Sequence, residues 1–270
     1  MKVEGVVYMK IGLIGCGTIG QFLLEQLNER KVLPNVRIVA IFDEREKSKE
    51  KLQRYSGQYH VQYETTLPSF LDVQMDLVIE CANVEAVRMY AEKIIQQKDF
   101  VVISIGALVD LTFYQHLEQL ATEKGHRLYL PAGAIGGLDL IQAAATLGEL
   151  DQVSLTTRKP AHALQEAAIE SPQTIFSGSA KEAIEKFPQN ANVAITLSYA
   201  GIGIEQTQVS IIADPAITRN IHCIQAKGAF GETTIKIAND PSPQNPKTSY
   251  LTSLSILKTI QQLTQTVKIA

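Results

Sequence analysis

The segment KIGLIGCGTIGQFLLEQLNER, residues 10–30, determines which architecture the rest of the chain can build. It begins with a short apolar run typical of a buried strand, passes through closely spaced glycines, and continues with apolar residues at helical spacing. Gly15, Gly17 and Gly20 form the pattern GxGxxG. The pattern alone is weak evidence, but here it follows a predicted strand, opens a predicted helix and precedes Asp43 at the end of the next predicted strand. Together these features predict a βαβ unit whose glycine-rich turn binds the pyrophosphate of a dinucleotide.

Each residue of the turn has a physical role in this prediction. Gly15 permits the tight turn, Gly17 lets the backbone approach a pyrophosphate, and Gly20 allows the helix to pack closely on the strand. Thr18 and Ile19 open the helix, where free backbone amides and the helix dipole attract anions. We therefore expect all five residues to contact the cofactor.

Asp43 is expected to set the choice of cofactor. A carboxylate at the end of the second strand accepts hydrogen bonds from the adenosine ribose and repels a 2′-phosphate, which favours NAD over NADP. Arg45 lies two residues further on and weakens this preference. NADP is therefore kept as an alternative cofactor.

Further β-rich runs alternate with helical patterns as far as residue 131, as in parallel βαβ units. The predicted strands are Arg37–Asp43, Met75–Ala82, Phe100–Ile105 and Arg127–Leu130, and the predicted helices between them include Val84–Gln97 and Leu111–Lys124. Near-continuous apolar strands suit a sheet covered on both faces. Such sheets bind ligands at the carboxyl ends of their strands, so Cys81 and Ala82 are expected to border the cofactor.

The sequence changes character after Pro131. Ser179 and Glu182 have the spacing of a capping box, which predicts the start of a helix. The other elements expected here are a glycine-rich run PAGAIGGLD, a helix at Leu140–Leu150, strands at Gln152–Thr157, Gln206–Ala213, Ile221–Lys227 and Glu232–Ala238, an irregular loop at Asn239–Lys247 and an amphipathic helix at Thr248–Leu263.

The predicted fold is an α/β chain with two domains. An N-terminal Rossmann domain, a doubly wound parallel sheet, takes residues 1–134 and 240–270, because the C-terminal helix is expected to return to it. An inserted α+β substrate domain takes residues 135–239.

Composition and charge exclude several classes of protein. The 270 residues include 25 Lys plus Arg and 28 Asp plus Glu, for a formal net charge of −3, which offers no broad cationic surface to nucleic acid. No run approaches the roughly 18 to 20 apolar residues of a membrane span. The first residues are too polar for a secretory signal, so a cytoplasmic location is expected. Cys16, Cys81 and Cys223 lack CxxC spacing, which predicts buried free thiols and no metal site.

A more specific likeness lies in segments that follow Pro131. They are PAGAIGGLDLIQAA (131–144), TTRKP (156–160), FSGSAKEAIEKFPQNANVA (176–194), AGIG (200–203), ADPAITRNIHCIQAKGAFG (213–231) and NPKTS (245–249). In this order they resemble the L-aspartate dehydrogenase family, and the likeness runs from about residue 10 to the C-terminal helix. The resemblance implies a reversible NAD- or NADP-dependent oxidation of L-aspartate to iminoaspartate, a precursor of NAD. It also implies a homodimer, which agrees with an apolar strand face expected in the second domain.

The resemblance also implies individual roles. It places a catalytic histidine at His222, and Asn220 in the same motif is a candidate substrate contact. It places contacts with the nicotinamide end of the cofactor at Ala132 or Ala134, and at Asn190 or Asn192, without deciding within either pair.

A histidine suits this chemistry. Hydride leaves the α-carbon of aspartate only when the amine is neutral, so a group that titrates near neutral pH must take its proton and return it in reverse. A single histidine on a strand is more often structural, and His60, His116 and His126 are interpreted in this way. His162, close after TTRKP, is the one rival to His222.

The two carboxylates of aspartate require cations or amide groups, because unpaired charge is costly in a closed cleft. Lys247, in the motif NPKTS just before the predicted start of the last helix, is the first candidate. Lys159 or Arg158, in TTRKP, is the second.

Two alternatives stay open. Another two-domain enzyme, such as a homoserine dehydrogenase or a dihydrodipicolinate reductase, shares a GxGxxG domain and a returning C-terminal helix, but not the motifs after Pro131. A non-catalytic NAD-binding sensor would keep the fold and would need no titrating group at His222.

Overall fold

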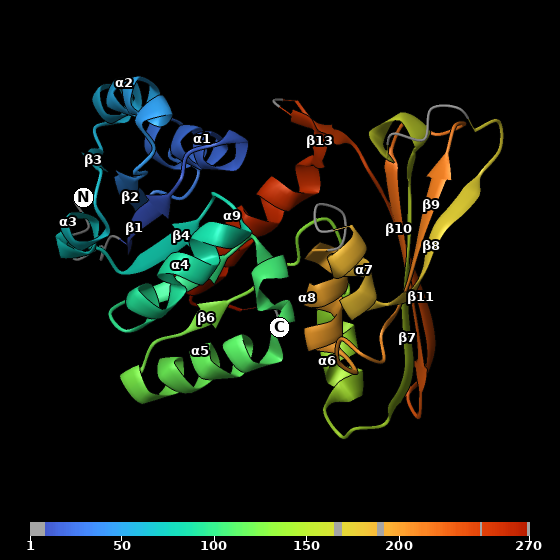
Figure 1. Ribbon diagram of the computed structural model, residues 1–270. Coiled ribbons are helices and arrows are strands. Elements are labelled where there is room, and N and C mark those ends of the chain that lie inside the picture. Colours follow the sequence, from blue (N-terminus) through green and yellow to red (C-terminus); the bar gives the residue numbers. More distant parts are fainter. Residues whose placement is uncertain (1–8, 165–168, 188–191, 244, 269–270) are drawn as a thin grey trace. The chain divides into compact units, whose positions relative to one another are not determined.

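The computed structural model of the chain describes residues 9–164, 169–187, 192–243 and 245–268 (Figure 1). Contacts divide them into two compact units. The first comprises the described residues up to Pro131 together with Leu257 and the residues after it, and the second comprises Ala132–Ile256. The predicted boundary at residue 134 lies close to the observed one between Pro131 and Ala132. The predicted boundary at residue 240 lies well before the observed one between Ile256 and Leu257.

The first unit is built on a six-stranded parallel sheet with the order β3-β2-β1-β4-β5-β6. Its strands are β1 (Met9–Ile14), β2 (Val36–Phe42), β3 (Gln62–Glu64), β4 (Leu77–Glu80), β5 (Asp99–Val102) and β6 (Leu128–Tyr129). The strand order reverses between β1 and β4. Doubly wound sheets bind ligands at the carboxyl ends of the strands where this reversal occurs. The predicted Rossmann sheet is confirmed.

Helices connect these strands. They are α1 (Thr18–Leu24), extended by a π-helical turn (Glu25–Glu29), α2 (Lys49–Tyr59), α3 (Leu67–Asp72), α4 (Val84–Ile95) and α5 (Leu111–Lys124). Asn83 caps α4, because its side-chain oxygen accepts a hydrogen bond from the amide of Ala86 at 2.9 Å. The cap fixes the chain just beyond the carboxyl end of β4, which is the edge where a ligand is expected.

The second unit is built on a mixed sheet with the order β11-β10-β7-β9-β8, in which β7 and β9 are the one pair of adjacent strands, among those described, that is parallel. Its strands are β7 (Leu150–Pro160), β8 (Gln173–Ser179), β9 (Gln208–Asp214), β10 (Asn220–Gly228) and β11 (Gly231–Asn239). Its helices are α6 (Leu138–Ala145), α7 (Ala180–Lys186) and α8 (Asn192–Ala200). The predicted capping box at Ser179 and Glu182 is confirmed at the start of α7.

The two faces of this sheet differ. Helices α6, α7 and α8 lie on one side of it (Figure 1), and Leu155 and Ile224 are among the residues buried on that side. Among the described residues of the unit, no helix covers the other side, where Thr156 and Cys223 pair with each other. That side also carries the half-buried Ile221. It is therefore less apolar than the sequence suggested.

Several expected elements differ in the structure. The helix predicted to reach Leu150 ends at Ala145, because Gly148 has a φ of 72° and a turn there leads directly into β7. The segment predicted as an irregular loop contains a small antiparallel pair, β12 (Pro241–Ser242) and β13 (Asn245–Ser249). Proline is compatible with such short edge strands, because it needs no ladder partner there.

The last helix, α9 (Tyr250–Thr264), begins two residues later than predicted, and its second half is counted with the first unit. Its buried face contains Ser253, Ile256 and Ile260, whereas Leu254 is exposed. The stripe predicted for this amphipathic helix consists of the apolar residues at 251, 254, 257, 260 and 263. They repeat every third residue, and this spacing drifts by about 60° per step in a helix with 3.6 residues per turn. One face cannot hold all five positions, so the predicted stripe was wrong.

Candidate functional site

The glycine-rich turn of the first unit fits a pyrophosphate. Gly15 has a φ of 75°, and a Cβ there would lie 2.8 Å from the Cβ of Ala82. A Cβ at Gly20 would lie 3.2 Å from the carbonyl of Gly15. At Gly17, by contrast, the nearest atom would be the carbonyl oxygen of Cys81, at 4.0 Å. Packing therefore explains the glycines at 15 and 20, whereas Gly17 leaves open space beside the backbone that a ligand can occupy.

Thr18 and Ile19 open α1, as predicted from the sequence, and are half-buried. Lys51, on α2, donates a hydrogen bond from Nζ to the carbonyl of Cys16 at 2.9 Å. It brings a positive charge to the turn, which favours an anionic ligand. Lys51 was not predicted from the sequence, because a lysine on a surface helix carries no signal of where its side chain reaches.

Asp43 follows β2 and is held by Arg45. Nε of Arg45 donates to Oδ1 at 2.8 Å, Nη2 donates to Oδ2 at 2.6 Å, and the Arg45 amide also donates to Oδ1. Asp43 is 6% exposed. Burial alone would raise its pKa, but the hydrogen bonds from Arg45 and Ser48 and the Arg45 charge outweigh burial, so the pKa of Asp43 lies below its usual value. The carboxylate is thus ionised and ready to accept hydrogen bonds at neutral pH.

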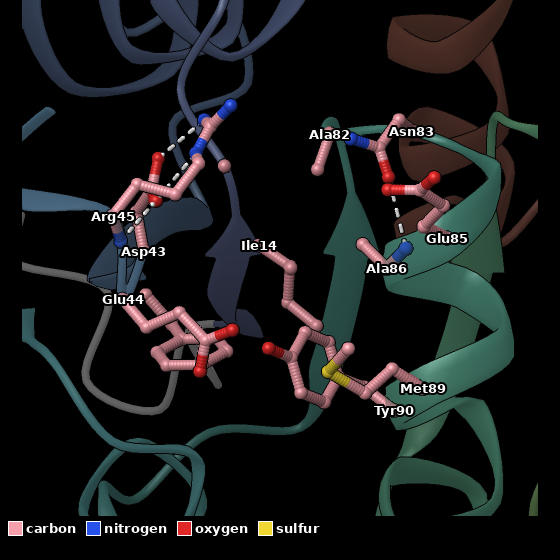
Figure 2. Close-up of a pocket in the computed structure, with 12 residues that line it drawn as sticks. Ile14, Asp43, Glu44, Arg45, Ala82, Asn83, Glu85, Ala86, Met89 and Tyr90 are labelled. Atoms are coloured by element: carbon pink, nitrogen blue, oxygen red, sulfur yellow. Dashed lines mark hydrogen bonds and ion pairs between the residues drawn. The ribbon is translucent and has the colours of Figure 1, made fainter. Parts of the chain in front are cut away.

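These residues form one wall of a pocket. Figure 2 shows Asp43 and Arg45 on one side of it and Ala82 and Asn83, which follow β4, on the other. Cys81 precedes them, and its amide donates to the carbonyl of Ile14 at 2.8 Å. The structure therefore brings Asp43 and Ala82 together with Gly15 around one pocket in the first unit, whereas Cys81 lies beside this pocket without lining it.

In the second unit, His222 lies on β10 and is 3% exposed. Its Nδ1 is 3.0 Å from Oγ1 of Thr157, its neighbour on β7. Burial, followed by the positive charge of Lys159, lowers the pKa of His222 from 6.5 to about 4. Without a ligand the ring is therefore neutral at pH 7, and its pKa is lower than the near-neutral value expected from the sequence.

The strand β7 separates the two cations of the TTRKP motif. Side chains alternate along a strand, so Lys159 shares the face of Thr157 and His222, whereas Arg158 points to the other face. Arg158 pairs there with the buried Asp214 at 3.0 Å. Burial lowers the pKa of Lys159 to about 8. Of the two alternatives, the structure therefore places Lys159 beside the histidine.

Other predicted residues of this unit lie nearby. Asn220 is two residues from His222 on the same face of β10 and pairs with Asn239 of β11. Nδ2 of Asn239 donates to the carbonyl of Ala134 at 2.9 Å, which ties the glycine-rich run to the same region. The sequence analysis missed both Thr157 and Asn239, because a threonine and an asparagine in strand-forming stretches carry no signal of a site.

The glycine-rich run also approaches α8. A Cβ at Gly133 would lie 3.5 Å from Val193, the residue after Asn192. Ala132 and Asn192 are half-buried, whereas Ala134 is buried. Asn190 lies outside the described residues. The structure thus brings the run that contains Ala132 and Ala134 close to the start of α8, where Asn192 lies.

Lys247 lies in strand β13 rather than in the predicted irregular loop, and its side chain is outside the described part of the structure. His162 is exposed in a short 3₁₀ turn. All three cysteines are free thiols, but only Cys16 is buried, whereas Cys81 and Cys223 are half-buried. No group of three or more potential metal ligands occurs among the described side chains. Within the same residues, no helix is long and apolar enough to cross a membrane.

Comparison with known proteins covers both units. Residues 15–131 match the family described as "Homoserine dehydrogenase, NAD binding domain", and residues 139–263 match the family described as "Aspartate dehydrogenase, C-terminal". The L-aspartate dehydrogenase of Methanosarcina barkeri is 38% identical over 97% of this chain and 99% of its own length. That of Methanocaldococcus jannaschii is 36% identical with the same coverage.

Among solved structures, the aspartate dehydrogenase of Thermotoga maritima has a TM-score of 0.77 at 30% identity and covers 97% of this chain and 100% of its own. A homoserine dehydrogenase of Thiobacillus denitrificans has a TM-score of 0.62 at 14% identity, a likeness of fold alone. An NAD-binding Rossmann domain joined to a mixed-sheet domain defines a two-domain dehydrogenase. Within that class, the chain belongs to the L-aspartate dehydrogenase family.

Proposed function

We propose that this protein is an NAD-dependent L-aspartate dehydrogenase, which oxidises L-aspartate to iminoaspartate and releases a proton, and which also runs in reverse. The similarity to L-aspartate dehydrogenases over 97% of the chain carries this proposal, because it includes the second unit as well as the nucleotide-binding unit. The likeness to homoserine dehydrogenase supports only the first unit and the fold.

The residues of the first unit hold the dinucleotide. Gly15, Gly17 and Gly20 shape the turn for its pyrophosphate, with Thr18 and Ile19 at the start of the helix. Asp43 accepts hydrogen bonds from the hydroxyls of the adenosine ribose. Cys81 and Ala82 pack against the turn at Gly15. When bound, NAD supplies a carbon that accepts hydride from the α-carbon of the substrate.

Arg45 allows the cofactor site to bind NADP as well. Its guanidinium forms a two-pronged ion pair with Asp43, yet the side chain is 47% exposed. Although Asp43 repels a 2′-phosphate, Arg45 can therefore break its ion pair with that carboxylate and bind the phosphate instead. On this basis NAD is the preferred cofactor and NADP is accepted more weakly.

His222 is the catalytic acid–base. To accept a proton at Nε2, the ring must carry its hydrogen on Nδ1 and donate it to Oγ1 of Thr157, which is 3.0 Å away. The ring then takes a proton from the ammonium group of aspartate and returns it in the reverse reaction. Two substrate carboxylates nearby would raise the pKa of His222 toward neutrality, because negative charge stabilises the imidazolium.

Lys159 is the cation best supported as a partner of a substrate carboxylate, since it lies on the face of His222 and its charge already acts on that ring. Asn220 is proposed to donate hydrogen bonds to the substrate from the same face. Lys247 is proposed for the second carboxylate. Ala132 or Ala134 and Asn190 or Asn192 are proposed to contact the nicotinamide end of the cofactor.

The protein is proposed to act as a cytoplasmic homodimer that supplies iminoaspartate for NAD synthesis. Support for the dimer comes from the sheet face of the second unit that no described helix covers, with Ile212, Ile221 and Cys223 on it. A second copy would shield these half-buried side chains from water.

NADH absorbance provides the test. Purified protein is mixed with NAD and either L-aspartate, L-homoserine or no substrate. The proposal expects NADH formation with L-aspartate alone. Activity with L-homoserine would favour the other dehydrogenase class, and NAD binding without turnover of either substrate would favour a sensor.

A further inference from the structure

Glu80 is a buried carboxylate that the proposed reaction does not use. It is the last residue of β4 and is 0% exposed. Oε1 accepts hydrogen bonds from the amide of Ala82 at 2.7 Å and from the hydroxyl of Ser104 at 2.9 Å. Oε2 accepts hydrogen bonds from the amides of Ser104 at 2.8 Å and Ile103 at 3.2 Å. One side chain thus connects the segments that follow two adjacent strands, β4 and β5.

The arrangement of donors fits the ionised form of this side chain. A carboxylate offers two acceptor sites on each oxygen, and here each oxygen receives two hydrogen bonds. A protonated carboxyl group would instead carry a hydrogen among three amide donors that cannot accept it, and only the Ser104 hydroxyl could turn to do so. Burial raises the pKa of Glu80, and the four hydrogen bonds from Ser104, Ala82 and Ile103 oppose that rise.

Such a group is costly to bury, and an apolar side chain could fill the same space more cheaply. The segments that Glu80 connects give a reason for burying a carboxylate at this position. Ala82 packs against the glycine-rich turn, since a Cβ at Gly15 would lie 2.8 Å from the Ala82 Cβ. Ala82 and Asn83 also line the pocket opposite Asp43 (Figure 2).

We infer that Glu80 is a positioning residue of the cofactor site: its carboxylate holds the segments after β4 and β5 in the conformation that admits the dinucleotide. This inference rests on the proposed cofactor site, but not on the identity of the amino-acid substrate. Glu80 acts through Ala82 and the turn at Gly15, so it affects binding of the cofactor and not the chemical step.

The test compares Glu80→Gln with Asp99→Asn. Glutamine keeps the shape of Glu80 but turns one acceptor oxygen into a donor that faces other donors. Asp99 is the matched control, because it also links two strands: it accepts hydrogen bonds from the Arg127 amide at 3.0 Å and the Tyr129 hydroxyl at 3.3 Å. Asp99 is the first residue of β5, so these bonds lie at the amino ends of the strands, whereas Glu80 lies at the carboxyl end of β4. NAD affinity is measured by calorimetry, folding by thermal melting, and the amides of Ala82, Ile103 and Ser104 by hydrogen exchange.

For Glu80→Gln we expect the Kd for NAD to rise at least about tenfold, a change of about 1.4 kcal/mol, with faster exchange at these amides. At saturating NAD, kcat should stay within about twofold, because substrate chemistry is untouched. Asp99→Asn should leave the Kd for NAD unchanged.

A folded Glu80→Gln protein that binds NAD like the wild type would overturn the inference, as would losses of binding and kcat that merely follow the loss of folded protein. If Glu80→Gln does not fold, Ser104→Ala is the deciding variant, because it removes one hydrogen-bond donor and keeps the charge of Glu80. This variant should bind NAD about fivefold more weakly, the effect typical of one lost hydrogen bond. Unchanged affinity for NAD would overturn the inference. A wild-type protein that binds no NAD would instead refute the proposed cofactor site itself.

Discussion

Lowering the pH should reveal the environment of His222. Burial and the nearby charge of Lys159 place its pKa at about 4 in the ligand-free protein, against 6.5 for a free imidazole. The difference corresponds to about 3 kcal/mol, at about 1.4 kcal/mol for each pH unit. Because this ring binds its proton more weakly in the folded state than in the unfolded state, its contribution to stability is present above pH 6.5 and is lost as the pH falls toward 4.

The loss can be worked out for an accessible pH range. Between pH 7 and pH 5 the unfolded chain becomes protonated at this position and the folded protein largely does not, so His222 alone should lower the free energy of unfolding by about 2 kcal/mol. His222→Gln lacks the titrating group, and its stability should fall less over the same range by about that amount. Urea denaturation followed by circular dichroism measures both proteins.

Nuclear magnetic resonance gives the pKa directly. The chain has five histidines, and the signal of His222 is the one that disappears in His222→Gln. We expect it to titrate near pH 4 without ligand and at higher pH with NAD and succinate, whose carboxylates stabilise the imidazolium. A ligand-free pKa of 6.5 or above, or a pKa that the dicarboxylate leaves unchanged, would refute this reasoning about the site.

Three substitutions test other parts of the account. Asp43→Ser should weaken NAD binding about tenfold or more, through loss of charged hydrogen bonds to the ribose, and should improve NADP binding because Arg45 is released; unchanged discrimination in a binding titration would contradict the ribose assignment. Lys159→Met should raise the KM for L-aspartate about tenfold or more. In the wild type this KM should rise above about pH 8, because Lys159 loses its proton there. A KM that changes neither in the variant nor with pH would show that Lys159 does not bind the substrate. Thr157→Val should lower kcat about fivefold, the effect of one hydrogen bond, without changing the Kd for NAD, and full activity would show that Thr157 does not orient the ring.

The first unit could be predicted closely because its signals are local. The glycines of the turn, the apolar runs of β1 and β2 and the aspartate that follows β2 all lie within a short stretch, and each has a conformational or chemical reason that is independent of the rest of the chain. Helix α5 has the predicted bounds Leu111–Lys124, and in the structure Asp110 caps its start and Gly125 its end.

The second unit was less predictable because its site depends on how strands pair. The sequence could not choose between Arg158 and Lys159, and only the register that sets Thr157 beside His222 shows which cation shares the face of the imidazole. Glu80, in the first unit, was missed for another reason: an acidic residue at the end of a strand gives no signal in the sequence of the amide and hydroxyl donors that surround it in the tertiary structure.

The most direct test of the proposed chemistry is the turnover of His222→Ala with NAD and L-aspartate, measured beside the Kd for NAD. We predict that kcat falls about a hundredfold or more, as is typical when a general acid–base is removed, while NAD binds as tightly as in the wild type. Turnover close to that of the wild type would contradict the account. So would an equal loss of turnover and NAD binding, because a purely structural histidine would produce that result.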